Sequence, residues 1–142
     1  MILFLSFDGV LHLSCPKQPR LSRLPLLEQW LLQHPEVRLV ISSKWRNEMN
    51  LDTLRKLFSP HLQQRIIGVT PVITRHPDDH YWRLSEIFDW MKHCANDQVW
   101  LILDDGIFPD RFNRLVKCNP ELGLTNHDIE KLSTLKQQLQ AV

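Results

Sequence analysis

The chain has no excess of charge of either sign. It carries 17 lysines and arginines against 16 acidic residues, a formal net charge of +1 with neutral histidines. Many proteins that bind nucleic acids or membrane surfaces carry a strong positive field, and a balanced chain has none. Bulk electrostatics therefore point to no class of partner, although local basic patches remain compatible with the composition.

Long apolar runs and paired cysteines are also missing. The longest apolar stretches fall well short of the ~20 residues that span a bilayer. The apolar start has no basic region before it and is interrupted by Asp8, which argues against a signal peptide. The three cysteines, Cys15, Cys94 and Cys118, are odd in number and have no Cys-x-x-Cys spacing. We therefore expect a cytoplasmic protein with neither a disulfide framework nor a zinc site.

The chain does have the composition of a soluble globular domain. Hydrophobic residues make up 43% and charged residues 23%, which are ordinary values. The length of 142 residues, without repeats or linkers, predicts one domain over 1–142. Short apolar runs alternate with amphipathic stretches, a pattern typical of parallel β-α-β units. With right-handed crossovers, the sequence predicts an α/β fold, a three-layer α/β/α sandwich around a mostly parallel sheet.

Apolar periodicity and stop signals place the individual elements. The segment 71–79 contains two prolines and two adjacent acids and is expected to be a loop. Polar residues follow the first, second and fourth strands, whose carboxyl ends should share one edge of the sheet, so we expect a site there. Strands are expected at 2–7, 37–41, 66–69, 99–103 and 114–118, and helices at 24–34, 50–58, 81–93 and after the N-cap Thr125.

Three acidic residues are the main candidates for chemistry at this edge. Asp8 follows the first strand, and Asp104 and Asp105 follow the fourth. Crowded carboxylates repel one another unless a cation neutralises them, and hard oxygen ligands select Mg²⁺. The sequence thus predicts a magnesium site formed by the three acids. The alternative is structural: Asp104 and Asp105 cap the following turn, and Asp8 holds a tight bend with Gly9.

The opening run, from Ile2 to Leu11, closely resembles the first motif of the haloacid dehalogenase (HAD) superfamily, an apolar strand ending in Asp-x-Asp-Gly-[Val/Thr]. Asp8, Gly9 and the following valine match it, but Ser6 stands in place of the first Asp. Further segments resemble a small branch of compact HAD domains, some of which occur in multidomain RNA-repair proteins. The resemblance implies a Rossmann-like HAD core. The segment after the first strand is too short for a folded cap domain, and the approach to the third helix has no room for one, so we expect no cap domain. The further segments are Ser-Ser-x-Trp-Arg (42–46), Arg-x-x-Glu-Ile (83–87), Trp-x-x-Leu-Asp-Asp (100–105) and Gly-Leu-Thr (123–125).

The resemblance also implies a role for each motif. In the family the first Asp attacks phosphorus, the second acts as general acid and base, and Mg²⁺ is bound by the first Asp, the backbone carbonyl of the second and a motif-four Asp. Ser6 therefore removes an ionised nucleophile and a metal ligand together, which weakens Mg²⁺ binding. A serine hydroxyl is a weak nucleophile without an activating base. Loss of a hydrolase nucleophile costs about 10⁶ in kcat, so we expect strongly reduced phosphatase activity.

The second and third motifs supply the phosphate-binding residues that the family implies. Ser42 and Ser43 are both candidates to bind the transferred phosphoryl group. Ser42 is the better placed, because Ser43 would point to the opposite face of a continuing strand. Gly9 and Lys44 would add contacts to the phosphate, and Arg83 would neutralise phosphoryl charge. The alternatives are a helix N-cap at either serine and a solvated Arg83.

Three functions remain open. The first is a HAD-fold protein with impaired chemistry that binds a phosphorylated ligand or partner. The second is an active Mg²⁺-dependent phosphatase, if Ser6 is an engineered replacement of Asp or is bypassed. The third is an interaction module. An uncapped site is open and favours a macromolecular phosphate such as a nucleic-acid end. Basic residues expected on its approach are Lys17, Arg20, Arg23, Lys44 and Arg46.

Two other features carry weaker expectations. The segment from His76 to His80 has metal-ligand residue types at close spacing, but a solvated loop is the simpler interpretation. Trp45 and Trp82 lie near the expected site and are candidates for substrate contact. Cys118 has no evident histidine partner and is expected to be an ordinary strand residue.

Overall fold

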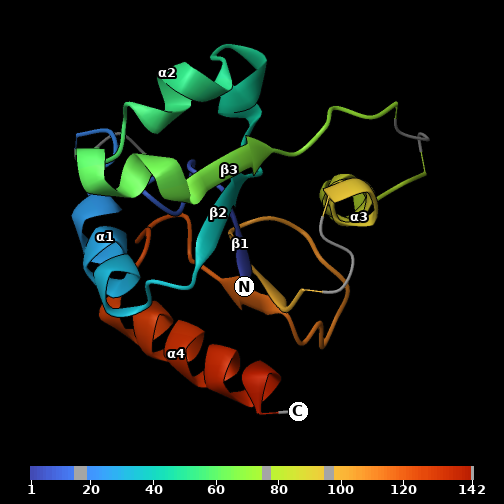
Figure 1. Ribbon diagram of the computed structural model, residues 1–142. Coiled ribbons are helices and arrows are strands. Elements are labelled where there is room, and N and C mark those ends of the chain that lie inside the picture. The colour runs from blue at the N-terminus through green and yellow to red at the C-terminus, as the bar shows by residue number, and fades with distance from the viewer. Residues whose placement is uncertain (15–18, 75–77, 95–97, 142) are drawn as a thin grey trace.

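The computed structural model describes residues 1–14, 19–74, 78–94 and 98–141. Its centre is a five-stranded sheet in which every pair of neighbouring strands is parallel (Figure 1). The strand order is β3-β2-β1-β4-β5. The predicted mostly parallel sheet is therefore confirmed. The strands are β1 (Ile2–Leu5), β2 (Arg38–Ile41), β3 (Ile66–Val69), β4 (Trp100–Asp104) and β5 (Leu115–Lys117).

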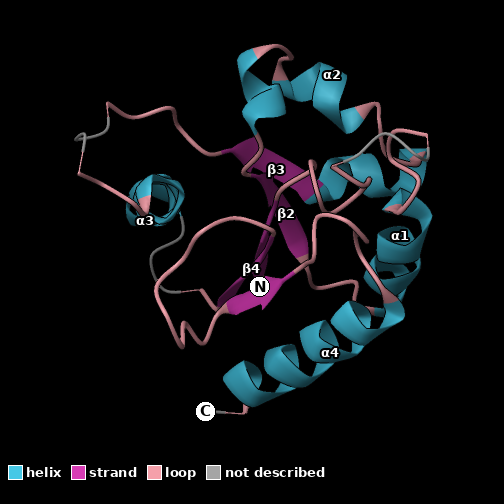
Figure 2. Ribbon diagram, turned by 180° about the vertical axis from the view of Figure 1, so that it is seen from behind, coloured by secondary structure: helices cyan, strands magenta, loops and turns pink. Residues whose placement is uncertain are grey.

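Helices cover both faces of this sheet. Figures 1 and 2 show α1 and α4 on one side and α3 alone on the other. This is the three-layer α/β/α sandwich that the sequence predicts, and it is consistent with a Rossmann-like HAD core. The helices are α1 (Leu24–Gln33), α2 (Leu51–Arg55), α3 (Trp82–Cys94) and α4 (Asn126–Gln140), with 3₁₀ helices η1 (Lys44–Asn47) and η2 (Pro60–Arg65).

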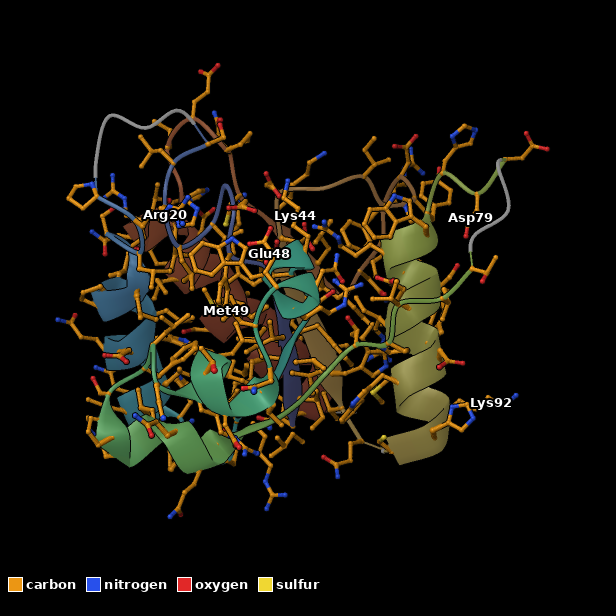
Figure 3. The ribbon with its side chains drawn as sticks, turned by 90° about the horizontal axis from the view of Figure 1, so that it is seen from above. Arg20, Lys44, Glu48, Met49, Asp79 and Lys92 are labelled. Atoms are coloured by element: carbon orange, nitrogen blue, oxygen red, sulfur yellow. The ribbon has the colours of Figure 1, made fainter. Side chains whose placement is uncertain are left out.

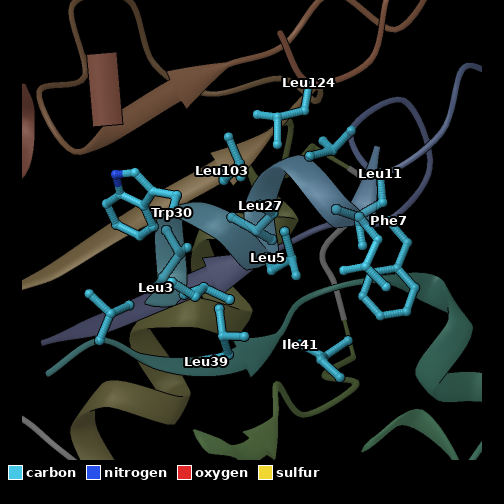
Figure 4. Close-up of a cluster of buried hydrophobic side chains, with 14 of the residues drawn as sticks. Leu3, Leu5, Phe7, Leu11, Leu27, Trp30, Leu39, Ile41, Leu103 and Leu124 are labelled. Atoms are coloured by element: carbon cyan, nitrogen blue, oxygen red, sulfur yellow. The ribbon is translucent and has the colours of Figure 1, made fainter. Parts of the chain in front are cut away.

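Strand β1 lies at the centre of the sheet and contributes to both cores. Its four side chains are fully buried. Leu3 and Leu5 pack in the larger core with α1 and α4 (Figure 4), whereas Ile2 and Phe4 pack in the smaller core beneath α3. Because successive side chains of a strand point to opposite faces, a strand covered on both sides needs an unbroken apolar run. The opening of the sequence has such a run for this reason.

Most predicted elements are present, with shifted boundaries. Strand β3 begins and ends where expected, and the predicted helices 24–34, 81–93 and the last one correspond to α1, α3 and α4. The first strand was predicted to reach Phe7 but ends at Leu5, because the chain turns there: the N–H groups of Val10 and Leu11 both donate to the Phe7 carbonyl. The helix predicted at 50–58 ends at Arg55.

The N-caps explain where two helices begin. Thr125 accepts a hydrogen bond from the Asp128 N–H, and the Asp128 side chain accepts one from the Thr125 N–H, which makes a capping box. The predicted cap of the last helix is thus confirmed. Asn50 caps α2 through the Thr53 N–H at 2.9 Å. Pro60 opens η2.

The connections at the carboxyl edge carry no inserted domain. Within the described residues, neither the β1–α1 segment nor the β3–α3 segment contains a helix or a strand. The site between them is therefore uncapped in the described part of the chain, as the short connecting segments predict. In the same described ranges, no helix combines the length and the hydropathy that crossing a bilayer requires.

Candidate functional site

Four polar residues form a row at the carboxyl edge of the sheet, each directly beyond or at the end of its strand. The Ser42 N–H donates to the Leu5 carbonyl (2.8 Å), and the Ser6 N–H donates to the Leu103 carbonyl (3.1 Å). Thr70 continues the row through its N–H to the Ile41 carbonyl (3.0 Å). Asp104 is the last residue of β4. The order across the sheet is Thr70, Ser42, Ser6, Asp104.

This row faces α3. Leu5 belongs to the core on the α1 side, so by strand alternation Ser6 turns toward α3. Arg83, in the first turn of α3, confirms this orientation. Its Nη1 donates to Asp104 Oδ1 at 2.7 Å and to Ser6 Oγ at 3.4 Å. The structure thus brings together Ser6, Arg83 and Asp104, residues from three different motifs of the sequence.

Asp104 is a buried carboxylate with one unsatisfied oxygen. Its Oδ1 accepts hydrogen bonds from Arg83 and from the Gly106 N–H (2.8 Å). Its Oδ2 is buried and has no hydrogen-bond partner among the described residues. Burial raises the pKa of Asp104 to about 6, although Arg83 opposes the shift. A ligand or cation that binds Oδ2 would compensate for this burial.

Asp8 is held by two nitrogen donors that lie outside the motif it belongs to. Its Oδ1 accepts from His12 Nε2 at 2.8 Å and from Trp45 Nε1 at 3.1 Å. His12 Nδ1 in turn accepts from the Leu21 N–H at 3.3 Å. Because Nδ1 is an acceptor there, Nε2 carries the proton and donates to Asp8. Lys44 Nζ lies 4.0 Å from Asp8 Oδ2. Two fixed donors therefore orient the Asp8 carboxylate.

Gly9 brings the first-motif loop against the fourth-motif loop. Its φ is +74°, and a Cβ at this position would lie 2.2 Å from Asp105 Oδ2. Only glycine accepts both the backbone conformation and the approach without strain. Asp105 consequently sits against the turn that carries Asp8.

The two serines after β2 have different environments. Ser43 Oγ accepts a hydrogen bond from the Trp45 N–H at 3.3 Å and caps η1. Ser42 Oγ is fully buried and has no partner among the described residues, like Thr70 Oγ1 two strands from Ser6. Ser42 therefore keeps hydrogen-bonding capacity for a ligand, whereas Ser43 uses its oxygen in the cap. Thr70 was not predicted from the sequence as a site residue, because a single threonine after a short strand matches no motif.

Arg46 does not line the approach to the site, contrary to expectation. Its Nη2 forms a 2.6 Å ion pair with Glu86 Oε1 of α3, and the two side chains are only 5% and 3% exposed. Its Nη1 also donates to the Ser43 carbonyl at 2.8 Å. Arg46 thus ties the loop after β2 to α3. Burial raises the pKa of Glu86 despite this arginine. Of the other basic residues predicted on the approach to the site, Lys17 lies outside the described residues. Arg20 lies beside the Trp45 ring.

The weaker sequence features have structural roles where the structure describes them. Asp79 accepts from the Tyr81 N–H at 3.0 Å and from Ser85 Oγ at 3.1 Å, at the start of α3. His76, from the proposed metal segment, lies outside the described residues, as does Cys15. Cys118 is buried and Cys94 is exposed. The Trp82 ring lies 5.1 Å from the Arg83 guanidinium carbon.

The site fits Mg²⁺ with fewer carboxylates than expected. Within the described residues, no three acidic, histidine or cysteine side chains form a metal-binding group, so Asp8, Asp104 and Asp105 do not make the predicted cluster. The reason is that Asp8 Oδ1 is bound by its two donors and Asp105 packs at Gly9. Mg²⁺ needs only one or two carboxylates beside waters and phosphate oxygens. The unpartnered Oδ2 of Asp104 is a suitable ligand atom.

Comparisons with known proteins give one match. A family model described as the HAD domain in Swiss Army Knife RNA repair proteins matches residues 2–129. No curated protein and no solved structure matches the chain. The matched range includes every residue of the site described above.

Proposed function

Because the chain belongs to the family of HAD domains in Swiss Army Knife RNA repair proteins, we propose that it binds the phosphorylated end of a nucleic acid and hydrolyses it poorly. Membership of this family makes the chain a HAD-type, phosphohydrolase-like protein. The ligand and the impairment are our proposal.

The surroundings of Ser6 are the observation that carries the impairment. Its Oγ is buried, and its one hydrogen-bond partner among the described residues is the Arg83 guanidinium. Arginine stays protonated in proteins and cannot take up the serine proton. Asp8, the nearest candidate base in the family's scheme, has its Oδ1 occupied by His12 and Trp45. Within the described residues, the Ser6 hydroxyl thus makes no hydrogen bond to a carboxylate or an imidazole that would activate it.

The groups that would bind a phosphate are retained. Arg83 supplies charge-assisted donors, and Ser42 Oγ is a buried hydroxyl with no partner in the described part of the chain. Lys44 adds positive charge at the mouth, where its side chain is 72% exposed. These features support binding of a phosphate monoester between Ser6, Ser42 and Arg83.

Mg²⁺ would be held by Asp104 through its unpartnered Oδ2, with waters and phosphate oxygens as the remaining ligands, and would neutralise charge on a bound phosphate. Ser6 offers it a neutral oxygen where the family has a carboxylate, so its affinity should be weakened. The protein residues do the remaining work. Arg83 orients the phosphate, and His12 and Trp45 hold the Asp8 carboxylate in one orientation at the edge of the site.

The second candidate is an active phosphatase, and the intact framework around Ser6 favours it. The Arg83 guanidinium already contacts both Ser6 and Asp104. An Asp at position 6 would therefore find this positive charge beside it. If Ser6 replaces a natural Asp, the chain with Asp would turn over a macromolecular phosphate.

Phosphate release in Mg²⁺ separates these possibilities. The chain, Ser6→Asp and the uncharged control Ser6→Asn would be tested on an aryl phosphate and on RNA oligonucleotides with a 5′- or 3′-phosphate, with binding measured in parallel. We expect binding by all three and turnover by Ser6→Asp alone. Turnover by the unmodified chain equal to that of Ser6→Asp would contradict the impairment. No binding to any phosphate would favour the interaction module.

We also propose a cytoplasmic location. Cys94 and Cys118 are free thiols, and free thiols persist in reducing compartments. Differential alkylation of the protein in cells would test this, since an oxidising compartment would leave these cysteines modified.

A further inference from the structure

An open pocket of about 500 Å³ begins at Asp8 and extends away from the phosphate-binding row. It lies between the loop after β1 and the η1 region, and its lining includes Arg20, Lys44 and Trp45. Figure 3 shows Arg20 and Lys44 at the same side of the molecule, with Glu48 near them and α3 well apart. Its volume lies within the ~300–1,000 Å³ of small-molecule sites.

The side chains in this pocket combine flat surfaces with charges. The Arg20 guanidinium carbon lies 5.5 Å from the centroid of the Trp45 ring. The His12 ring lies 5.5 Å from the same ring, tilted by 34°. Proteins that recognise single-stranded nucleic acids stack bases on aromatic rings and on arginine planes. A pocket for a small anion would need neither the aromatic surface nor this volume.

The charges are mixed, which also suits a nucleotide. Arg20 and Lys44 can pair with backbone phosphates, while the Glu48 carboxylate accepts hydrogen bonds of the kind that base amino groups donate. A phosphopeptide could pair with Arg20 and Lys44, but it has no base to stack on the Trp45 ring. The arrangement therefore favours a nucleic-acid end over a phosphoprotein.

We infer that this pocket is a nucleotide subsite, which holds the nucleotide adjoining the terminal phosphate of a single-stranded nucleic acid. The inference rests on the proposed function, because Asp8 belongs both to the pocket and to the phosphate-binding site. The terminal phosphate lies at Ser6 and Arg83, and the chain of the ligand leaves past Asp8 into the pocket. Arg20 and Lys44 then determine preference for a polynucleotide over a free phosphate.

Equilibrium binding of labelled RNA decamers tests the inference. The probes are a decamer with a terminal phosphate, the same decamer with hydroxyl ends, a phosphopeptide of matched charge, and inorganic phosphate as competitor. The variant is Arg20→Gln/Lys44→Gln, and the control is Lys92→Gln, an exposed lysine at the far end of α3 (Figure 3). All substituted side chains are exposed, so the fold should be unaffected.

We expect the double variant to bind the phosphorylated decamer at least ~10-fold more weakly and to lose about 1.4 from the slope of log K against log salt, 0.7 for each cation. Because Lys44 also lies at the phosphate-binding site, inorganic phosphate is compared on Arg20→Gln alone, whose affinity for it should match the unmodified chain. Lys92→Gln should match the unmodified chain with every probe. Unchanged decamer binding by the double variant would overturn the subsite while leaving phosphate binding intact. Equal affinity for the phosphopeptide would overturn the ligand class. Failure of inorganic phosphate to bind at all would instead overturn the proposed function.

Discussion

The Arg46–Glu86 ion pair should contribute strongly to stability, and its contribution should depend on pH. The two side chains are 5% and 3% exposed, and Arg46 Nη2 lies 2.6 Å from Glu86 Oε1. Removing one partner of a buried pair leaves an uncompensated charge, which costs about 3–5 kcal/mol. We therefore expect Arg46→Met to lower the free energy of unfolding by that amount at pH 8.

The pH dependence follows from Glu86 itself. Without Arg46, Glu86 can avoid burying its charge by taking up a proton, at a cost of about 1.4 kcal/mol for each pH unit above 4.5, its ordinary pKa. This cost limits the loss of unfolding free energy from the buried Glu86 charge to ~5 kcal/mol at pH 8 and ~0.7 kcal/mol at pH 5. The Arg46–Ser43 hydrogen bond adds about 1 kcal/mol at either pH. Because burial raises the folded-state pKa of Glu86, stability in the variant falls as pH rises above 4.5.

Urea unfolding followed by tryptophan fluorescence at pH 5 and pH 8 measures both losses. The matched control is Asp52→Asn, which breaks the Arg55–Asp52 pair; Asp52 is 83% exposed there, and the expected loss is below ~1 kcal/mol. The double variant Arg46→Met/Glu86→Leu should regain most of the stability, because no charge is then buried. A loss below ~1 kcal/mol for Arg46→Met at both pH values, or equal large losses at both, would refute the reasoning.

Three further predictions concern single positions. Gly9→Ala should lower the free energy of unfolding by about 1–3 kcal/mol, because φ is positive and the new Cβ would meet Asp105; a loss near zero in urea unfolding would contradict the close approach. Thr125→Ala should cost about 1 kcal/mol by removing the capping box of α4, while Thr125→Ser should retain the stability of the unmodified chain. In native protein, an alkylating reagent should modify the exposed Cys94 and spare Cys118, whose burial raises the thiol pKa; peptide mapping that finds Cys118 labelled before unfolding would be inconsistent with this structure.

The elements were largely predictable because their signals are local. Strand β1 is buried on both faces, and such a strand appears in the sequence as an apolar run. The cap at Thr125 could be predicted because a capping box lies within four consecutive residues. The end of β1 was misplaced, since the turn at Phe7 is set by hydrogen bonds to Val10 and Leu11 that apolar character does not reveal.

The identities of the site residues were also predictable, but their partners were not. Ser6, Arg83 and Asp104 were each suggested by a short motif, and the crossovers of the sheet bring them together. Arg46 was expected at the mouth of the site, yet it is buried against Glu86, 40 positions away. Asp8 accepts its hydrogen bonds from His12 and Trp45. These two residues come from separate segments of the sequence, so no motif predicts the pair.

Apolar periodicity and residue identity are local properties of the chain, so the parallel α/β architecture and the replacement at position 6 could be predicted from them. Which groups meet depends on the tertiary structure. Among the described residues, it leaves the Asp104 carboxylate with an unpartnered oxygen, and it hydrogen-bonds the Ser6 hydroxyl to the Arg83 cation. Contacts between distant residues depend on the strand order and on how α3 packs over the sheet. The chemistry of the site depends on those contacts.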